Sequence, residues 1–218
     1  MAFKVTSNTA FETVFADDYL LVLNKPSGLL SVPGKGADKQ DCLSARVQAS
    51  YPDALIVHRL DMATSGLMLM ARGPTVQTAL SKLFEARAVH KRYVAVVDGQ
   101  MQASPDWQLI DRPIALDWPS RPLRIIHPSG KPSKTRWRVL HYDENANTTR
   151  VELEPVTGRS HQLRVHLAAT GHPLVGDALY APAVVCAKAA RLLLHACKLS
   201  FTHPATSEHM VFESAPDF

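Results

Sequence analysis

Alternation between apolar and polar residues recurs along the chain and predicts more strands than helices. Short apolar runs indicate buried strands, and strict alternation indicates strands with one exposed face. Two alternating segments bracket the polar turn at residues 143–147 and predict a β-hairpin. The predicted strands are residues 20–23, 66–72, 93–97, 135–142, 148–155, 192–201 and 209–212.

Helical spacing of apolar residues predicts three helices. Residues 42–51 and 74–86 carry apolar side chains on one face, and the second segment has a proline in its first turn, where a missing N–H is tolerated. Residues 160–170 form the third predicted helix, with Ser160 as its N-cap and Gly171 as its C′ residue.

Together these patterns predict an α+β fold in which helices and loops flank a mixed, mainly antiparallel sheet. The proline-rich residues 100–131 are expected to form a long connection with strand fragments. No repeat or linker interrupts the 218 residues, so we expect residues 1–218 to form a single domain. Apolar residues make up 46% of the chain and charged residues 20%, which is typical of a globular protein.

The charge balance is compatible with a polyanionic partner without requiring one. Net charge is +4 at pH 7, a mild basic excess that an ordinary soluble protein also carries. No apolar run approaches the ~20 residues needed to cross a membrane. Three scattered cysteines without a Cys-x-x-Cys pair indicate reduced thiols in a cytoplasmic protein. The ten histidines show no zinc-binding spacing, so no metal is expected.

Asp61 is the residue whose surroundings most suggest chemistry. It lies in the sequence HRLDMATSG at residues 58–66, directly before a predicted strand. An acid on a turn at the end of a sheet can present its carboxylate to a cleft, although aspartate in such a place is more often structural. The immediate neighbours of Asp61 leave both roles open.

Five motifs in order resemble those of RluA-type pseudouridine synthases, which raises the catalytic interpretation above the structural one. The resemblance extends from about residue 20 to the C-terminus, and one motif alone would carry a real risk of coincidence. The motifs are NKPSG (24–28), HRLDMATSG (58–66), KRYVAV (91–96), GRSHQLRVH (158–166), which residues 171–180 extend, and RLLLHA (191–196).

The resemblance implies an RNA-modifying isomerase that needs no cofactor. Such enzymes break the N-glycosidic bond of a uridine, turn the uracil and form a C5–C1′ bond, so no redox step is involved. The first motif begins by residue 24, so the N-terminal S4-type module of many relatives is not expected. The chain, including residues 117–122, is similar to compact members of the family. We therefore expect a monomer acting on stem-loops of 23S rRNA and of tRNA anticodon arms, with no DNA or membrane partner.

Motif positions imply roles for four residues. Asp61 takes the place of the nucleophile, which could add to the uracil or the ribose or stabilise an electron-poor sugar. Arg159 takes the place of its ion-pair partner, although the residue alone would suggest phosphate binding. Tyr93 is expected at the uracil, where its ring can stack and its hydroxyl could move a proton. Leu194 is expected to pack against the base or to fill the core.

Basic residues near the motifs are candidates for RNA contact. A uridine inside a folded RNA must leave the base stack to be reached, and His58 and Arg59 are placed to enter the gap. Arg59 is the better candidate because its flat cation can stack and hydrogen-bond together, unless it forms a salt bridge within the protein. The candidate phosphate contacts are Lys25, Lys91, Arg92 and Arg164, with Arg121 and Arg124 as weaker ones.

Three alternatives remain open. The chain could modify a different tRNA uridine, or it could bind or fold RNA without catalysis. Asp61, Tyr93 and Arg159 together argue against pure binding, because an anionic ligand does not require a carboxylate facing it. A carboxylate-dependent glycosidase would need a second acid at a set distance, and no motif supplies one.

Overall fold

The structure is a computed structural model that describes residues 11–102, 104 and 106–218. The described strands are β1 (Glu12–Ala16), β2 (Leu20–Lys25), β3 (Ala54–Ile56), β4 (Ser65–Arg72), β5 (His90–Asp98), β6 (Gln108–Asp111), β7 (Ile114–Leu116), β8 (Arg124–Ile126), β9 (Lys134–Asp143), β10 (Thr148–Pro155), β11 (Leu194–Thr202) and β12 (His209–Glu213). The helices are α1 (Leu43–Gln48), α2 (Pro74–Glu85), α3 (Gln162–Ala169) and α4 (Ala183–Cys186), with a 3-10 turn at Ala37–Lys39.

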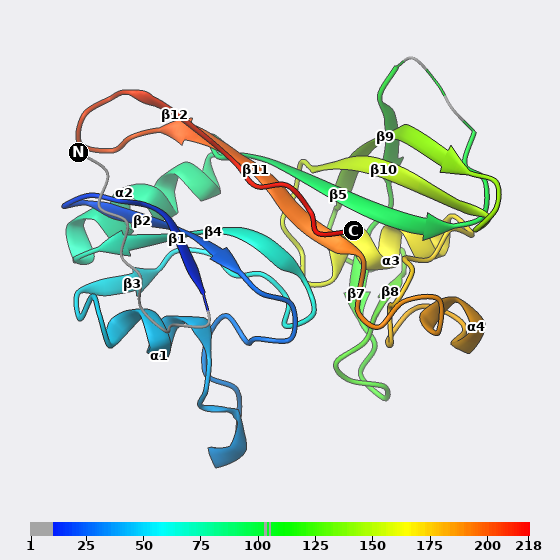
Figure 1. Ribbon diagram of the computed structural model, residues 1–218, viewed down its shortest axis with the longest axis horizontal. Coiled ribbons are helices and arrows are strands. Elements are labelled where there is room, and N and C mark those ends of the chain that lie inside the picture. Colours follow the sequence, from blue (N-terminus) through cyan, green and yellow to red (C-terminus); the bar gives the residue numbers. More distant parts are fainter. Residues whose placement is uncertain (1–10, 103, 105) are drawn as a thin grey trace.

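A ten-stranded sheet forms the body of the molecule (Figure 1). Its strands lie in the order β1-β2-β4-β11-β5-β10-β9-β6, while β3 pairs with β4 and β12 pairs with β11. Neighbouring strands are antiparallel except for β4 and β11, which are parallel. Strands β7 and β8 form a separate hairpin. The predicted α+β class with a mixed, mainly antiparallel sheet is therefore confirmed.

Strands β4 and β11 pair where two halves of the sheet meet. One half contains β1, β2, β3 and β4, and the other contains β5, β6, β9, β10, β11 and β12. Strand β4 is apolar along its length because both of its faces are covered: Leu69 belongs to a core that includes Leu80 of α2, and Met68 to a second core that includes Leu43 of α1. Residue 66 has a φ of +110°, and a Cβ there would lie 2.4 Å from the carbonyl oxygen of Ala196. Only glycine permits this close approach of the two strands.

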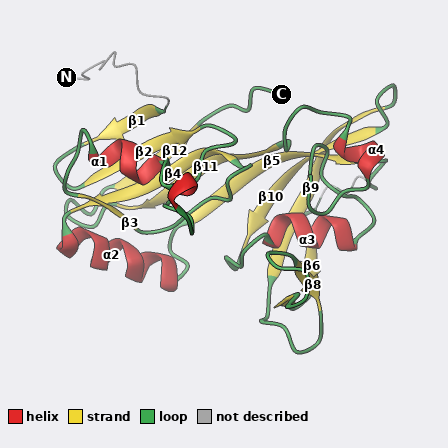
Figure 2. Ribbon diagram, turned by 90° about the horizontal axis from the view of Figure 1, so that it is seen from below, coloured by secondary structure: helices red, strands yellow, loops and turns green. Residues whose placement is uncertain are grey.

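Helices α2 and α3 lie under different halves of the sheet (Figure 2). The C-terminal end of α2 and the N-terminal end of α3 both contribute residues to the pocket described below. The fold therefore uses the two halves of the sheet to bring distant segments of the chain to one site.

Most predicted elements are confirmed, with shifts of a few residues at their ends. The predicted hairpin is β9–β10, the three predicted helices are α1, α2 and α3, and the fragments expected in residues 100–131 are β6, β7 and β8. Residues 103 and 105 of that segment lie outside the described residues. Strands β1 and β3 and helix α4 were not predicted, because three to five residues are too few to show a period.

The predicted N-cap of the third helix is wrong. Helix α3 begins at Gln162, and its N-cap is His161 in a left-handed conformation with no side-chain cap hydrogen bond. The predicted C′ residue is confirmed, since Gly171 follows the C-cap with a φ of +86°.

The single-domain prediction includes residues 1–10, which lie outside the described part of the chain, and it stays a prediction. Among the described residues, no helix is both long and apolar enough to cross a membrane.

Candidate active site

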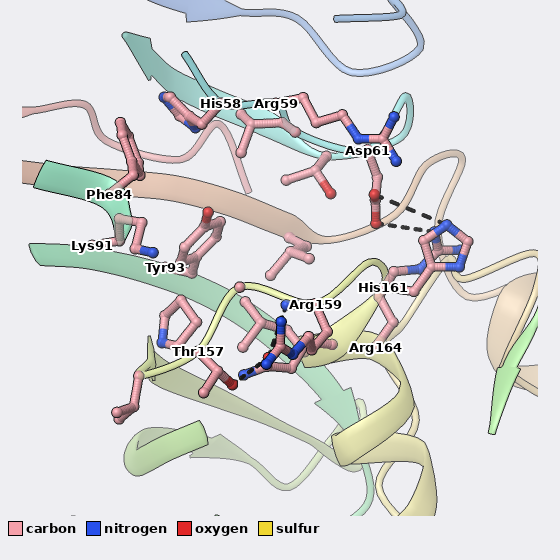
Figure 3. A pocket seen from close by; sticks show the side chains of 18 of the residues that line it. His58, Arg59, Asp61, Phe84, Lys91, Tyr93, Thr157, Arg159, His161 and Arg164 are labelled. Carbon is pink, nitrogen blue, oxygen red and sulfur yellow. Dashed lines mark hydrogen bonds and ion pairs between the residues drawn. The ribbon is translucent and has the colours of Figure 1, made fainter. Parts of the chain in front are cut away.

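A pocket of about 640 Å³ opens beside the junction of the two halves. Figure 3 shows Asp61 and His161 at one side of this pocket and Tyr93 and Lys91 at the other. The residues predicted from the sequence that line it are His58, Arg59, Asp61, Lys91, Tyr93, Arg159, Arg164 and Leu194. Eight of the ten predicted residues therefore meet in one pocket, and Lys25 and Arg92 do not line it.

Lys25 holds the loop that carries Asp61. Its side chain is buried, and Nζ donates to the carbonyl oxygens of Pro26, Leu29 and Met62 at 2.8, 2.7 and 3.0 Å. Burial lowers the pKa of Lys25 to about 8, and the Asp61 carboxylate acts in the opposite direction. The prediction that Lys25 contacts phosphate is therefore wrong, because its three donors are already engaged within the protein.

Two serines complete the attachment of this loop. Ser27 Oγ donates to the carbonyl oxygen of Ala63 at 2.7 Å, and Ser31 Oγ donates to that of Leu60 at 2.7 Å. Together with Lys25, these bonds fix the backbone on both sides of Asp61. The NKPSG motif thus has a positioning role that its sequence alone did not show.

A buried pair ties the far end of the same loop to β11. Ser65 Oγ lies 2.9 Å from Nδ1 of His195, and both side chains are buried. His195 directly follows Leu194, which is 2% exposed and lines the pocket. This contact fixes the position of Asp61 relative to the expected uracil-facing leucine.

Arg164 is the cation that the structure places beside Asp61. Its Nη1 lies 3.6 Å from Oδ2 of Asp61, while Nε and Nη2 donate to the carboxylate of Asp177 at 2.8 and 2.6 Å. Arg164 is 4% exposed and Asp177 fully buried. The short hydrogen bonds of the guanidinium therefore go to Asp177, and Asp61 gains a nearby positive charge while its lone pairs stay available.

The predicted pairing of Arg159 with Asp61 is wrong. Arg159 is exposed, and its Nε donates to the carbonyl oxygen of Pro132 at 3.4 Å. Arg159 precedes α3, whereas Arg164 lies in its first turn and is buried against Asp177. The prediction that Arg164 binds phosphate is wrong because its guanidinium is buried and donates to Asp177. Arg159 still lines the pocket, where it is open to RNA.

Tyr93 and Leu194 form an apolar wall opposite the charged groups. Tyr93 is 9% exposed, and burial followed by the nearby Asp61 carboxylate raises its pKa, so its hydroxyl is neutral at pH 7. Lys91 lies at the same wall with Nζ 5.8 Å from the centre of the Phe84 ring, and burial lowers the pKa of Lys91. Such a wall can accept a flat, neutral base.

His58 is a fixed part of the pocket wall. Its Nε2 accepts a hydrogen bond from the Leu69 N–H at 2.9 Å, and its ring stacks on Phe84 with centroids 4.6 Å apart. Burial, with a smaller effect of Lys91, lowers the pKa of His58 to about 3. These contacts hold the ring of His58 against α2 and β4, and its role in base extrusion stays a prediction. Arg59 is exposed at the pocket, and its role stays a prediction.

Arg92 points away from the pocket. Its Nη1 donates to Glu154 at 2.6 Å, and its guanidinium lies 4.3 Å from the centre of the Trp107 ring. Successive residues of a strand face opposite sides of the sheet, so Tyr93 faces the pocket and Arg92 does not. Arg92 therefore does not line the pocket, and its predicted contact with an RNA phosphate stays a prediction.

The weaker candidates lie in the loop of the β7–β8 hairpin and at the first residue of β8. Arg121 stacks on the exposed ring of Trp118 at 4.1 Å, and its contact with RNA stays a prediction. The backbone N–H of Arg124 donates to the hydroxyl of Tyr180 at 3.0 Å. Across residues 11–102, 104 and 106–218, no three His, Cys, Asp or Glu side chains are grouped so as to hold a metal ion.

Asp177, Tyr180 and His161 have no predicted role, although all three lie in the fourth motif or in the extension of that motif. Asp177 fixes Arg164, Tyr180 contacts His161, and Nε2 of His161 lies 3.9 Å from Oδ1 of Asp61. The sequence signal that could have identified this network is an aspartate, a tyrosine and a histidine within twenty residues.

Comparisons with known proteins agree with the geometry of the pocket. The family model described as RNA pseudouridylate synthase matches residues 19–169. The dual-specificity RNA pseudouridine synthase RluA of Escherichia coli (strain K12) is 47% identical over 206 residues, covering 94% of this chain and 93% of that protein. RluA of Vibrio vulnificus (strain CMCP6) is 49% identical over 197 residues, covering 88% of this chain and 78% of that one. The solved structure of human RNA Pseudouridylate Synthase Domain Containing 1 superimposes with a TM-score of 0.81 and 29% identity, covering 99% of this chain and 87% of that one.

Proposed function

The chain belongs to the family of RNA pseudouridylate synthases, and from this premise we propose that it isomerises uridines in stem-loops of 23S rRNA and tRNA anticodon arms, with Asp61 as the nucleophile. The dual specificity of the RluA proteins, which match nearly the whole chain, supports two classes of RNA substrate. The observation that carries the chemical part is the Asp61 carboxylate, which faces a pocket and lies 3.6 Å from a guanidinium already hydrogen-bonded elsewhere.

In the proposed reaction a uridine leaves the RNA stack and its base enters the pocket between Tyr93 and Asp61. The ring of Tyr93 supports the uracil, and Leu194 excludes water from beneath it. Asp61 adds to the base or the ribose, or stabilises the electron-poor sugar, while the N1–C1′ bond breaks. The uracil then turns, the C5–C1′ bond forms, the hydrogen on C5 leaves as a proton, and the freed N1 takes up a proton. Asp61 is released unchanged, so atoms and electrons balance without a cofactor.

Arg164 balances the charge of Asp61 without blocking it. A guanidinium that donated two short hydrogen bonds to Asp61 would hold both of its oxygens in the ground state. Because Asp177 accepts those bonds, Arg164 supplies a fixed positive field from a preorganised position. This arrangement fits a carboxylate that must form and break a covalent bond.

The test is release of tritium from RNA labelled at C5 of uridine, because forming the C5–C1′ bond expels that hydrogen. We expect release from both an unmodified tRNA anticodon stem-loop and a 23S rRNA stem-loop. Release from only one of them would contradict dual specificity and leave the isomerase. No release from either, or from a panel of other tRNA uridines, would contradict the proposed activity.

We further propose that the protein acts in the cytoplasm as a monomer. Sedimentation at the concentration used for the assay tests the monomeric state, and activity that depends on dimer formation would contradict it.

A further inference from the structure

His161 has an unusual backbone conformation at the N-terminus of α3. Its φ is 56° and its ψ is 16°, the left-handed region that residues with a Cβ seldom adopt. Strain of this kind persists where the surrounding structure requires it, often at functional sites. In Figure 3 the His161 ring points towards Asp61.

The two ring nitrogens of His161 face different partners. Nδ1 lies 2.6 Å from the hydroxyl oxygen of Tyr180, and Nε2 lies 3.9 Å from Oδ1 of Asp61. The Tyr180 oxygen already accepts the backbone N–H of Arg124 at 3.0 Å. The hydroxyl proton of Tyr180 is therefore free to be donated to Nδ1, which places the imidazole proton on Nε2, facing Asp61.

One buried carboxylate organises this arrangement. Oδ1 of Asp177 accepts the backbone N–H groups of Leu179 and Tyr180 at 2.9 and 3.2 Å, which fixes the turn that carries the tyrosine. The same carboxylate accepts both short hydrogen bonds of Arg164. Asp177 therefore sets the positions of both groups that approach Asp61.

We propose that His161 is a positioning residue for Asp61: held in its Nε2–H tautomer by Tyr180, it donates to Oδ1 when the base fills the pocket, while Arg164 faces Oδ2. This inference rests on the proposed function of Asp61. With one partner for each oxygen, the plane of the carboxylate is fixed relative to the uracil. The present distance of 3.9 Å is longer than a hydrogen bond, and catalytic contacts of this kind commonly shorten when substrate binds.

The arrangement requires a neutral imidazole. Burial lowers the pKa of His161; Asp61 and Asp177 oppose this effect, and Arg164 and Arg124 add to it. Burial raises the pKa of Tyr180, so the tyrosine keeps the proton that it donates. Protonation of His161 at low pH would place an N–H on Nδ1, opposite the hydroxyl proton of Tyr180. It would also place a full positive charge beside Asp61, which makes the carboxylate a weaker nucleophile. Wild type should therefore lose rate at acidic pH through His161.

Three variants test the proposal in single-turnover tritium release with saturating anticodon stem-loop. Asparagine tolerates the left-handed backbone but its amide is too short to reach Asp61, so His161→Asn should slow the reaction about 10- to 100-fold with the Kd for RNA unchanged within about two-fold. Glutamine reaches about as far as Nε2 and does not titrate, so His161→Gln should stay within about five-fold of wild type and lose the acidic limb of the rate profile. Tyr180→Phe should give an intermediate loss. The matched control is His141→Asn, an exposed change on β9 that should leave the rate unchanged.

Two results would overturn the positioning role and leave the proposed function intact, provided that wild type is active. One is a rate of His161→Asn equal to that of wild type, and the other is a rate of His161→Gln no higher than that of His161→Asn. Absence of tritium release by wild type would instead contradict the proposed function. Nitrogen NMR of the labelled imidazole gives a readout that does not depend on activity. We expect a proton on Nε2 in wild type and a mixture of tautomers in Tyr180→Phe, and a proton on Nδ1 in wild type would overturn the proposal.

Discussion

The guanidinium of Arg164 lies 3.6 Å from the carboxylate of Asp61, close enough to balance its charge and too far to bind its lone pairs. The short hydrogen bonds of the same guanidinium go to Asp177. Asp61 therefore has a fixed positive charge beside it, and its oxygens remain free to react. The motif positions instead predicted that Arg159 pairs with Asp61.

Substituting lysine for each of the two arginines distinguishes these alternatives. Arg164→Lys keeps the charge but loses the two-point contact with Asp177, so the single-turnover rate should fall at least about 100-fold. Arg159→Lys should cost less than about three-fold on a short stem-loop, because the hydrogen bond of the Arg159 side chain to the described residues goes to the carbonyl oxygen of Pro132 at 3.4 Å. Thermal unfolding of both variants separates rate effects from loss of fold. The reverse order of rates, in variants that stay folded, would contradict the pairing of Arg164 with Asp61.

Removing the Lys25 amine should destabilise the protein. Lys25→Met leaves three carbonyl oxygens without their donor in a buried place, and we expect the free energy of unfolding in urea to fall by about 2–4 kcal/mol. The matched control is Lys39→Met, an exposed change that should alter the free energy by less than about 0.5 kcal/mol. Equal small effects of the two changes would mean that Lys25 does not hold the Asp61 loop.

His58 should make the free energy of unfolding depend on pH. Its folded pKa of about 3 lies below the ordinary value of 6.5, so between these values the unfolded state binds more protons than the folded state. The free energy of unfolding should therefore fall as the pH drops below 6.5. Glutamine can accept the Leu69 N–H without titrating, so His58→Gln should lose about 2 kcal/mol less than wild type between pH 7 and pH 4.5. Parallel losses in the two proteins would show that His58 has nearly the same pKa in the folded and unfolded states.

The contiguous motifs predicted most of the site because four of the five contribute residues to one pocket. Asp61, Tyr93 and Leu194 come from different segments, and the sheet brings all three to one pocket. The partner of Asp61 could not be predicted in the same way. Arg159 is exposed before α3, and Arg164 is buried in the first turn by its contact with Asp177, which lies 13 residues further along the chain.

Burial of Lys25 was equally hidden in the sequence. One of its three acceptors, the carbonyl of Met62, lies 37 residues further along the chain, and a lysine in a turn is ordinarily exposed. Local patterns report the period of an element and the residue types at its ends. They do not report contacts that only the assembled sheet creates, such as the pairing of Ser65 with His195.

Arg59 offers a separate test of base extrusion. Its side chain is exposed at the pocket, where a flat cation can fill the gap left by an extruded uridine. Arg59→Ala should therefore reduce the rate on a structured stem-loop about ten-fold more than on a short unstructured RNA of the same sequence. Arg46→Ala, which removes a surface pair with Asp41, is the control for loss of positive charge. Equal losses on the two substrates would remove Arg59 from extrusion.

The most direct measurement compares wild type with Asp61→Asn in tritium release, with the Kd for RNA measured on the same samples. Asparagine keeps the shape of the side chain but cannot act as a carboxylate nucleophile. The account predicts no release above background from Asp61→Asn, with RNA affinity within a few-fold of wild type. Release at the wild-type rate would contradict the central claim that Asp61 carries the reaction.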